Sequence, residues 1–208
     1  MEKLLIVGAG GMGKEVVDLV LAVDQFEIAG FLDDDPNKKN TLVNQIPVLS
    51  DLDQMDKYRA IKHLVIAVAN PGVKKRIAAI AEKAGFQFPN LIHPSVVFGS
   101  GVSLGQGNII CAGSIVSTEV CLQNFITINP QCGIGHESNL HSFSTLYWGV
   151  HLGGNAIIGE GCELGTHSCV LQGLKLTDNT ILGAGAVAVK SIEQPGTYVG
   201  IPARIMNT

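Results

Sequence analysis

The spacing of apolar residues changes near residue 92, and the regions on either side predict different architectures. Before it, short apolar runs alternate with segments in which apolar residues recur at helical spacing, a pattern typical of alternating strands and helices. The continuous apolar run at residues 64–68 suits a strand covered on both faces of a parallel sheet. We expect an α/β domain with strands at residues 3–7, 26–32, 63–68 and 86–91.

Two helices are expected between these strands. The first follows a glycine-rich turn and places Val16, Val17 and Val20 on one face. The second begins after Asn70, a good N-cap residue, and ends before Gly85, which suits the position after a helix. Residues 37–62 carry no pattern that we can assign.

Residues 95–190 repeat with a period of six. Divided into 16 hexads, this segment has Ile, Leu or Val at the fourth position 14 times, against 14 times in the other 80 positions. Hexapeptide repeats are the sequence signature of a parallel β-helix. Each hexad supplies one short strand and a corner, and three hexads close a triangular coil of 18 residues whose interior holds the fourth-position side chains. About five coils are therefore expected, without an inserted loop.

Charge and composition narrow the class of protein. The chain has a net charge of −4 and 46% hydrophobic residues, which excludes a disordered chain and leaves no basic excess for nucleic acid. No apolar run approaches the roughly 18 residues of a membrane span. Five cysteines without a CxxC pair are expected to be reduced and buried in a cytoplasmic protein. The β-helix segment holds only seven charged residues: Glu119, Glu137, Glu160, Glu163, Lys175, Asp178 and Lys190.

The turn after the first strand has the form of a nucleotide-binding loop. Gly8, Gly10 and Gly13 fit G-x-G-x-x-G between a strand and a helix, and Asp33 lies 20 residues beyond Gly13. Such glycines let backbone N–H groups approach a phosphate at a helix N-terminus. A tight turn without a ligand and an NAD site are alternatives, but no second half-fold for a nicotinamide follows. We favour a different nucleotide ligand.

The order of motifs resembles one protein family. The segments are GAGGMGKEV at 8–16, FLDDDP at 31–36, IHPS at 92–95, GHES at 135–138 and VGIPAR at 199–204. Nearly the whole chain resembles the NeuD/PglD-type sugar acetyltransferases, which are left-handed β-helix hexapeptide acyltransferases with an N-terminal nucleotide-sugar-binding domain. The resemblance implies a Rossmann-like domain at 1–92 and a left-handed β-helix at 93–208. The repeat itself does not specify the hand.

The resemblance implies transfer of an acetyl group from acetyl-CoA to the amino group of a nucleotide-linked amino sugar. A UDP-4-amino-4,6-dideoxy sugar of bacterial glycan biosynthesis is favoured, and O-acetylation of sialic acid is an alternative. The reaction needs a group that accepts the amine proton and a donor to the developing oxyanion. By resemblance, His136 is the base and Glu137 supports it. The 18-residue coil independently predicts that Gly154 lies beside His136.

Further site residues follow from the same resemblance. The nucleotide sugar is expected at Gly10, Gly11, Met12, Asp33, Asp34 and Ala69, and coenzyme A at Thr145, Gly154, Thr166 and Ala184. Thr145 stands where the family commonly has a second histidine, and unlike histidine it cannot titrate. A homotrimer with active sites between subunits is implied, and no metal is expected.

Two other classes of protein were weighed. A γ-class carbonic anhydrase is also a hexapeptide β-helix, and His136 and His141 lie five residues apart. Its remaining zinc ligand would fall at Ser100, and a catalytic zinc needs about three protein ligands. A non-catalytic nucleotide-sugar-binding protein is the second, and the His136-Glu137 pair argues against it.

Overall fold

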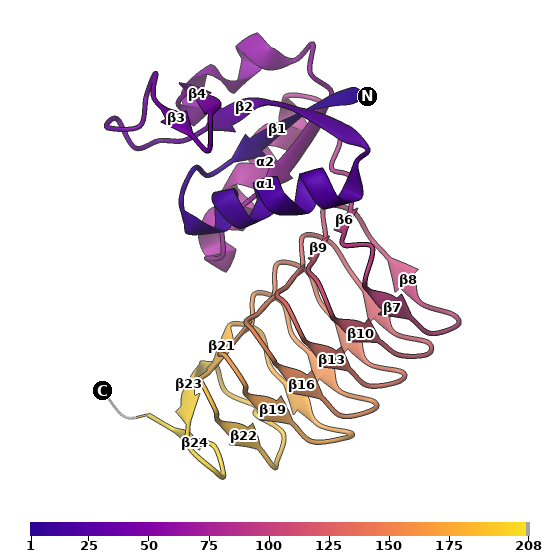
Figure 1. Cartoon of the computed structure of the whole chain (residues 1–208). Coiled ribbons are helices and arrows are strands. Elements are labelled where there is room, and N and C mark those ends of the chain that lie inside the picture. The colour runs from indigo at the N-terminus through magenta and orange to yellow at the C-terminus, as the bar shows by residue number, and fades with distance from the viewer. Residues whose placement is uncertain (207–208) are drawn as a thin grey trace. The chain divides into compact units, whose positions relative to one another are not determined.

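The computed structural model describes residues 1–206 and divides into two compact units (Figure 1). The first unit is Met1–Leu91, and the second begins at Ile92, one residue before the expected boundary. Within residues 1–206, neither α-helix exceeds 13 residues, and none is long and apolar enough to cross a membrane.

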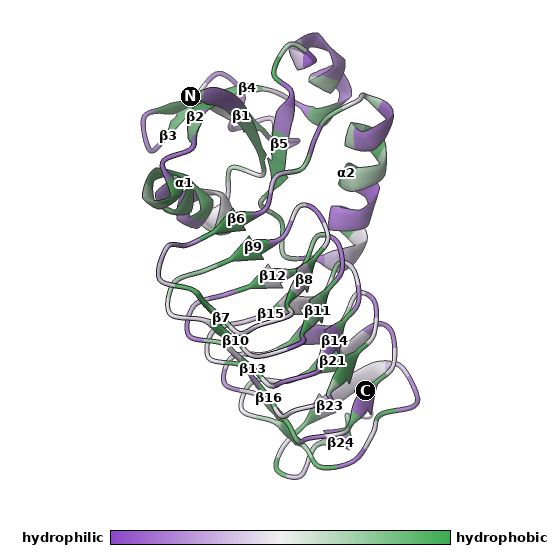
Figure 2. Cartoon of the chain, turned by 90° about the vertical axis from the view of Figure 1, so that its right-hand side faces the viewer, coloured by the Kyte–Doolittle hydropathy of each residue, from purple (hydrophilic) through white to green (hydrophobic). Residues whose placement is uncertain are grey.

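The first unit is built on a five-stranded sheet in the order β3-β4-β2-β1-β5. Neighbouring strands are parallel except for β3 and β4, which form an antiparallel pair at one edge. Helices α1 (Gly11–Val23) and α2 (Pro71–Lys83) lie on opposite faces of the sheet (Figure 2), and a 3₁₀ helix covers Leu52–Tyr58. The strands are β1 (Glu2–Val7), β2 (Phe26–Leu32), β3 (Leu42–Val43), β4 (Ile46–Ser50) and β5 (His63–Ile66).

Most elements expected in this unit are present. The Asn70 side chain accepts a hydrogen bond from the Val73 N–H at 2.9 Å, which caps α2, and Gly85 has a φ of +87° after its end. The strand expected at residues 86–91 is wrong. Gln87 forms only an isolated bridge to His63, because Pro89 has no N–H with which to continue a ladder.

The second unit is a parallel β-helix with three walls. Three sheets form them, and each strand inside the stack of coils pairs in parallel with the strands one coil away on either side. The six-stranded sheet has β7 (Val97–Phe98), β10 (Ile115–Val116), β13 (Gly133–Ile134), β16 (His151–Leu152), β19 (Cys169–Val170) and β22 (Val187–Ala188). The five-stranded sheet has β8 (Ser103–Leu104), β11 (Cys121–Leu122), β14 (Asn139–Leu140), β17 (Ile157–Ile158) and β20 (Lys175–Leu176). The eight-stranded sheet has β6 (Leu91–Ile92), β9 (Ile109–Ile110), β12 (Thr127–Ile128), β15 (Thr145–Leu146), β18 (Glu163–Leu164), β21 (Thr180–Leu182), β23 (Gly196–Val199) and β24 (Arg204–Ile205).

The register of these strands confirms the 18-residue coil. Ile115 pairs with Gly133, and Gly133 pairs with His151, so each step along this wall advances 18 residues. Fourth-position side chains from Ile110 to Ala188 fill the interior and are at most 5% exposed. Phe98 and Leu104 are 37% and 36% exposed, because β7 and β8 are edge strands with a neighbouring coil on one side only.

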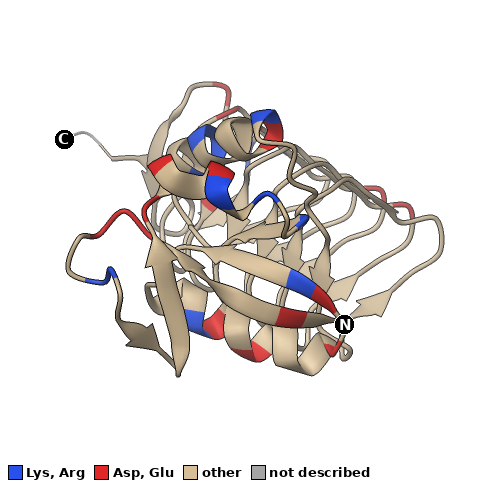
Figure 3. Ribbon diagram, turned by 90° about the horizontal axis from the view of Figure 1, so that it is seen from above, with Lys and Arg blue, Asp and Glu red and all other residues tan. Residues whose placement is uncertain are grey.

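The two units differ in surface chemistry. Charged side chains gather on the first unit, whereas the coils carry few (Figure 3). Cys132 and Cys162 are buried, but the other three cysteines are only half-buried, which corrects the expectation that all five lie in the core. The reason is position in the hexad: Cys132 and Cys162 occupy second positions, whereas Cys111, Cys121 and Cys169 occupy third or fifth positions.

Candidate active site

A histidine and a glutamate form a hydrogen-bonded pair on one corner of the β-helix. His136 and Glu137 occupy the turn between β13 and β14, and His136 Nδ1 lies 2.8 Å from Glu137 Oε2. Their side chains are 58% and 51% exposed, so the pair is open to solvent and to a substrate. Glu137 has a φ of +58°, the left-handed conformation that turns the chain at this corner.

Gly154 lies directly against this pair, as the coil length predicts. A Cβ built on Gly154 would lie within 2.5 Å of His136 Cε1, closer than real Cβ atoms approach another heavy atom. The neighbouring N–H groups are used, since Gly153 donates to Val170 O and Asn155 donates to His136 O. Among residues 1–206, the Gly154 N–H between them has no hydrogen-bond acceptor. The corner therefore presents an imidazole and an unused N–H side by side.

Two of the residues expected to bind coenzyme A, Thr166 and Ala184, occupy a different corner. Thr166 and Ala184 stack one coil apart, with the Gly185 N–H donating to Thr166 O at 2.8 Å, and both are exposed. Their column also contains Trp148, which is 46% exposed in the turn between β15 and β16. The structure thus brings Thr166 and Ala184 together, but it separates them from His136 by the width of the six-stranded wall. Thr145 is fully buried on β15.

Beside Trp148, the Tyr147 hydroxyl donates a hydrogen bond to Glu163 Oε2 at 3.0 Å. Burial, together with the hydrogen bond to the Glu163 carboxylate, raises the pKa of Tyr147 to about 12. Tyr147 is therefore a neutral hydrogen-bond donor throughout the physiological range, and no base at this position.

In the first unit, the glycine-rich loop joins β1 to α1. Gly8 has a φ of +99°, and a side chain there would collide with the Ala67 carbonyl oxygen. A side chain at Gly13 would meet the Gly8 carbonyl oxygen. These two glycines are needed to build the turn. By contrast, a Cβ at Gly10 or Gly11 meets nothing within 4 Å, so open space lies in front of the loop.

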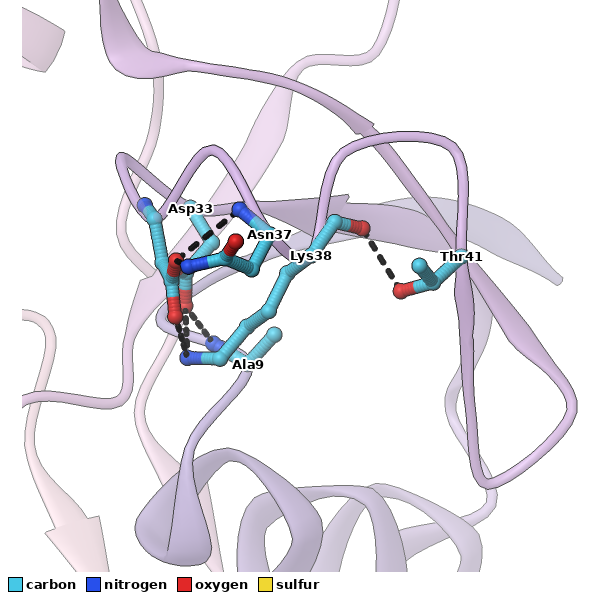
Figure 4. A network of polar contacts seen from close by, with 6 residues as sticks. Ala9, Asp33, Asn37, Lys38 and Thr41 are labelled. Atoms are coloured by element: carbon cyan, nitrogen blue, oxygen red, sulfur yellow. Dashed lines mark hydrogen bonds and ion pairs between the residues drawn. The ribbon is translucent and has the colours of Figure 1, made fainter.

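Asp33 holds the glycine-rich loop and accepts hydrogen bonds on both of its carboxylate oxygens. Its Oδ2 accepts hydrogen bonds from the Ala9 N–H at 2.7 Å and from Lys38 Nζ at 3.0 Å, and Oδ1 accepts from the Asp35 N–H at 2.9 Å (Figure 4). Burial opposes ionisation, but these donors outweigh it and hold the pKa of Asp33 below its ordinary value. Both carboxylate oxygens are therefore already in use.

Asp34 is the more accessible of the two expected carboxylates. Its Oδ1 accepts from the Leu52 N–H at 2.9 Å, and its Oδ2 lies 3.7 Å from the Arg76 guanidinium. Both side chains line a cavity of about 160 Å³ at the carboxyl ends of β1 and β2. Crevices at the carboxyl ends of parallel strands are where open α/β sheets bind ligands. Met12 is half-buried in the first turn of α1, and Ala69 is half-buried just after β5.

The sequence reasoning missed residues that the structure places beside the site. Arg76 was not singled out, although it lies one helical turn after the start of α2 and next to Asp34. Asn155 was also missed, although the arithmetic that identified Gly154 from His136 identifies Asn155 from Glu137. Within residues 1–206, no three His, Cys, Asp or Glu side chains cluster as a metal site would require.

Comparisons with known proteins bear on both units. Residues 3–81 match the family model of the PglD N-terminal domain. The acetyltransferase domain of PglB from Neisseria gonorrhoeae FA1090, also solved in complex with acetyl coenzyme A, is 31% identical. Its structure superposes with a TM-score of 0.92 over 99% of this chain and 100% of that one.

Two further relatives are similar over different parts of the chain. PerB from Caulobacter crescentus, solved with CoA and GDP-perosamine, is 26% identical with a TM-score of 0.76, over 100% of this chain and 98% of that one. A UDP-3-O-acylglucosamine N-acyltransferase from Janthinobacterium sp. (strain Marseille) is 29% identical over 106 residues, which is 51% of this chain. The chain spans only 30% of the length of that curated relative. The match to the PglB domain extends over both units, and this chain belongs to the NeuD/PglD-type family of sugar acetyltransferases.

Proposed function

We propose that the protein transfers an acetyl group from acetyl-CoA to the amino group of a nucleotide-linked amino sugar, with His136 as general base. The observation that carries the proposal is the arrangement of His136, Glu137 and Gly154 on one corner. The binding of acetyl coenzyme A by the PglB domain, and of CoA and GDP-perosamine by PerB, supports the choice of donor and acceptor class. Acetyl-CoA supplies the activated acyl group.

The hydrogen bond between His136 and Glu137 defines the direction of proton transfer. An ionised Glu137 can only accept, so the hydrogen between it and His136 belongs to Nδ1, and Nε2 keeps its lone pair. As the amine nitrogen attacks the thioester carbonyl, Nε2 takes the amine proton. The Gly154 N–H donates to the oxyanion of the tetrahedral intermediate. Collapse forms the amide and expels the thiolate of coenzyme A, which receives the proton from His136.

The nucleotide part of the acceptor binds the first unit in this proposal. Gly10 and Gly11 leave space for a phosphate at the N-terminus of α1, where backbone N–H groups and the helix dipole favour an anion. The cavity beside Asp34 is the candidate site for the base and ribose. Asp33 also lines this cavity, and it fixes the loop by accepting the hydrogen bond from the Ala9 N–H.

The active unit is a homotrimer of left-handed β-helices, with each site between two subunits. The support is that the His136 corner and the Thr166 corner lie on opposite edges of one wall, so one chain does not bring them together. A neighbouring subunit can supply the missing corner. Two apolar side chains project from this wall, Val97 at 58% and Ile115 at 55% exposed, and are surface that association would bury.

The decisive experiment measures release of coenzyme A thiol with a panel of UDP- and GDP-linked amino sugars and free sialic acid. His136→Ala is expected to lower kcat about 10²–10⁴-fold, with little change in acetyl-CoA affinity. The control is His63→Asn, a histidine of the first unit that pairs with Glu2. Wild-type turnover in His136→Ala, or no turnover in the wild type with any acceptor, contradicts the proposal.

The trimer is tested separately. Light scattering should give three times the 21.9 kDa of one chain. Mixing inactive His136→Ala chains with Ala184→Trp chains, which block the Thr166 corner, should restore part of the activity, because some interfaces then lack both lesions. A trimer that never complements would place the whole site within one subunit.

A further inference from the structure

We propose that Asn155 is a positioning residue that fixes the His136–Glu137 pair from the next coil. The inference rests on the proposed function and extends it to a residue outside the reacting groups. Asn155 lies 18 residues after Glu137, so it occupies the same corner position one coil further along.

Asn155 holds the pair through both its main chain and its side chain. Its N–H donates to the His136 carbonyl oxygen at 2.7 Å, which ties the backbone of the catalytic corner to the next coil. Its side-chain Nδ2 lies 3.4 Å from Glu137 Oε2. That same oxygen is bonded to His136 Nδ1 at 2.8 Å. One carboxylate oxygen is therefore held between the imidazole and the Asn155 amide, and the imidazole orientation depends on where that oxygen sits.

The coil on the other side does not offer a comparable donor. Glu119 precedes Glu137 by 18 residues, and its Cγ lies near Gly101, one coil further back. Its side chain is also an acceptor. The Glu137 carboxylate thus receives its side-chain hydrogen bonds from His136 and from Asn155.

The position makes three demands, and asparagine meets all of them. The corner needs a left-handed residue, and Asn155 has a φ of +56°. Asparagine and glycine adopt this conformation with least strain. The carboxylate needs a donor, which glycine lacks, and it needs a neutral neighbour, because an acid beside Glu137 would repel it. Aspartate fits the backbone conformation nearly as well, but its carboxylate would repel the Glu137 carboxylate instead of donating a hydrogen bond to it.

The test compares Asn155→Gly and Asn155→Asp with the same changes at Asn179. Asn179 is exposed at another corner with the same φ of +56°, and its N–H makes the equivalent bond to Glu160 O at 2.8 Å. We expect Asn155→Gly to lower kcat about fivefold and Asn155→Asp on the order of tenfold or more, with KM for acetyl-CoA unchanged. Added salt should partly restore Asn155→Asp, since it screens exposed charges. Both Asn179 variants should keep wild-type kinetics.

If Asn155 only shapes the backbone of the corner, the variants should rank differently in kcat. It needs only the left-handed conformation, so aspartate would serve at least as well as glycine, and the Asn155 and Asn179 pairs would behave alike. Either result, in a wild type that turns over, overturns the positioning role while leaving the proposed function intact.

A second measurement does not depend on turnover. Ring-nitrogen NMR, with His136 assigned from the His136→Ala spectrum among the six histidines, reports which nitrogen carries the proton. At alkaline pH, where an imidazole is neutral, the wild type should hold it on Nδ1, and Asn155→Gly should raise the fraction on Nε2. An unchanged tautomer ratio in Asn155→Gly refutes the inference, even if no acceptor sugar is ever found.

Discussion

Replacing Gly154 by alanine adds one methyl group beside the base without altering any ionisable group. A Cβ at this position would lie 2.5 Å from His136 Cε1 and 2.8 Å from Cδ2, distances that the ring must relieve by moving. The ring is more than half exposed, so it can swing into solvent. That movement breaks the 2.8 Å bond from Nδ1 to Glu137 and takes Nε2 away from the thioester.

The expected loss is large in rate and small in stability. Misplacing a general base forfeits up to its usual contribution of about 10²–10⁴-fold, or about 2.7–5.4 kcal/mol of transition-state stabilisation. Folding should be little affected, because an exposed side chain can move for about 0.5 kcal/mol or less. We therefore expect Gly154→Ala to lower kcat at least about 10²-fold, with a melting temperature within a few degrees of the wild type.

A double-mutant cycle separates this mechanism from general damage. If the methyl group acts by displacing the imidazole, adding Gly154→Ala to His136→Ala should cost almost nothing further in kcat, measured by release of coenzyme A thiol. Equal losses in both backgrounds would refute the reasoning and leave the Gly154 N–H, or access of the thioester, as the affected feature. A wild-type kcat in Gly154→Ala would show that the base does not work from the position seen here.

Three further predictions concern the two units separately. Gly11→Val should leave the melting temperature unchanged but raise KM for the nucleotide sugar, whereas Gly13→Ala should destabilise the fold by about 1–3 kcal/mol, because only Gly13 lies against backbone. Burial raises the pKa of Cys132 and of Cys162 to about 11, so both should resist iodoacetamide near neutral pH until urea exposes them, as followed by mass spectrometry. Folding lowers the pKa of Asp33 from 3.8, so its ionised form adds stability that is complete above that value and lost as pH falls through the folded pKa. Urea unfolding should therefore give Asp33→Asn a smaller free energy of unfolding than the wild type near neutral pH, and the difference should narrow in acid.

The coils could be read from sequence almost residue by residue. Each hexad repeats the same local rule, and 16 repeats average out any single exception such as Ala188. The interior therefore follows from counting, and so does the contact between His136 and Gly154, because stacking turns sequence distance into spatial proximity. The burial of three cysteines was predicted wrongly because it was inferred from residue type alone, and not from their place in the hexad.

The first unit was harder to predict because its decisive contacts are not periodic. The pairing of β4 with β2, and the hairpin of β3 with β4, depend on short strands in a segment without a regular pattern. Asp33 is expected to bind the nucleotide because it follows a strand, and its hydrogen bond from the Ala9 N–H could not be predicted from that spacing. Nothing in sequence spacing distinguishes a carboxylate that faces a ligand from one that faces its own loop.

The constant coil length has a consequence for how such a protein can change. Eighteen inserted residues with a regular hexad pattern would add one complete coil to the β-helix and leave every corner on its own edge. Placed between Glu137 and Gly154, however, such an insertion would put a different residue against the His136 imidazole. Gly154 and Asn155 would then lie two coils away from it. The same insertion elsewhere in the coils would lengthen the protein and keep the contact between His136 and Gly154. Between Glu137 and Gly154, therefore, the proposed chemistry rather than the folding of the coils restricts the length of the sequence.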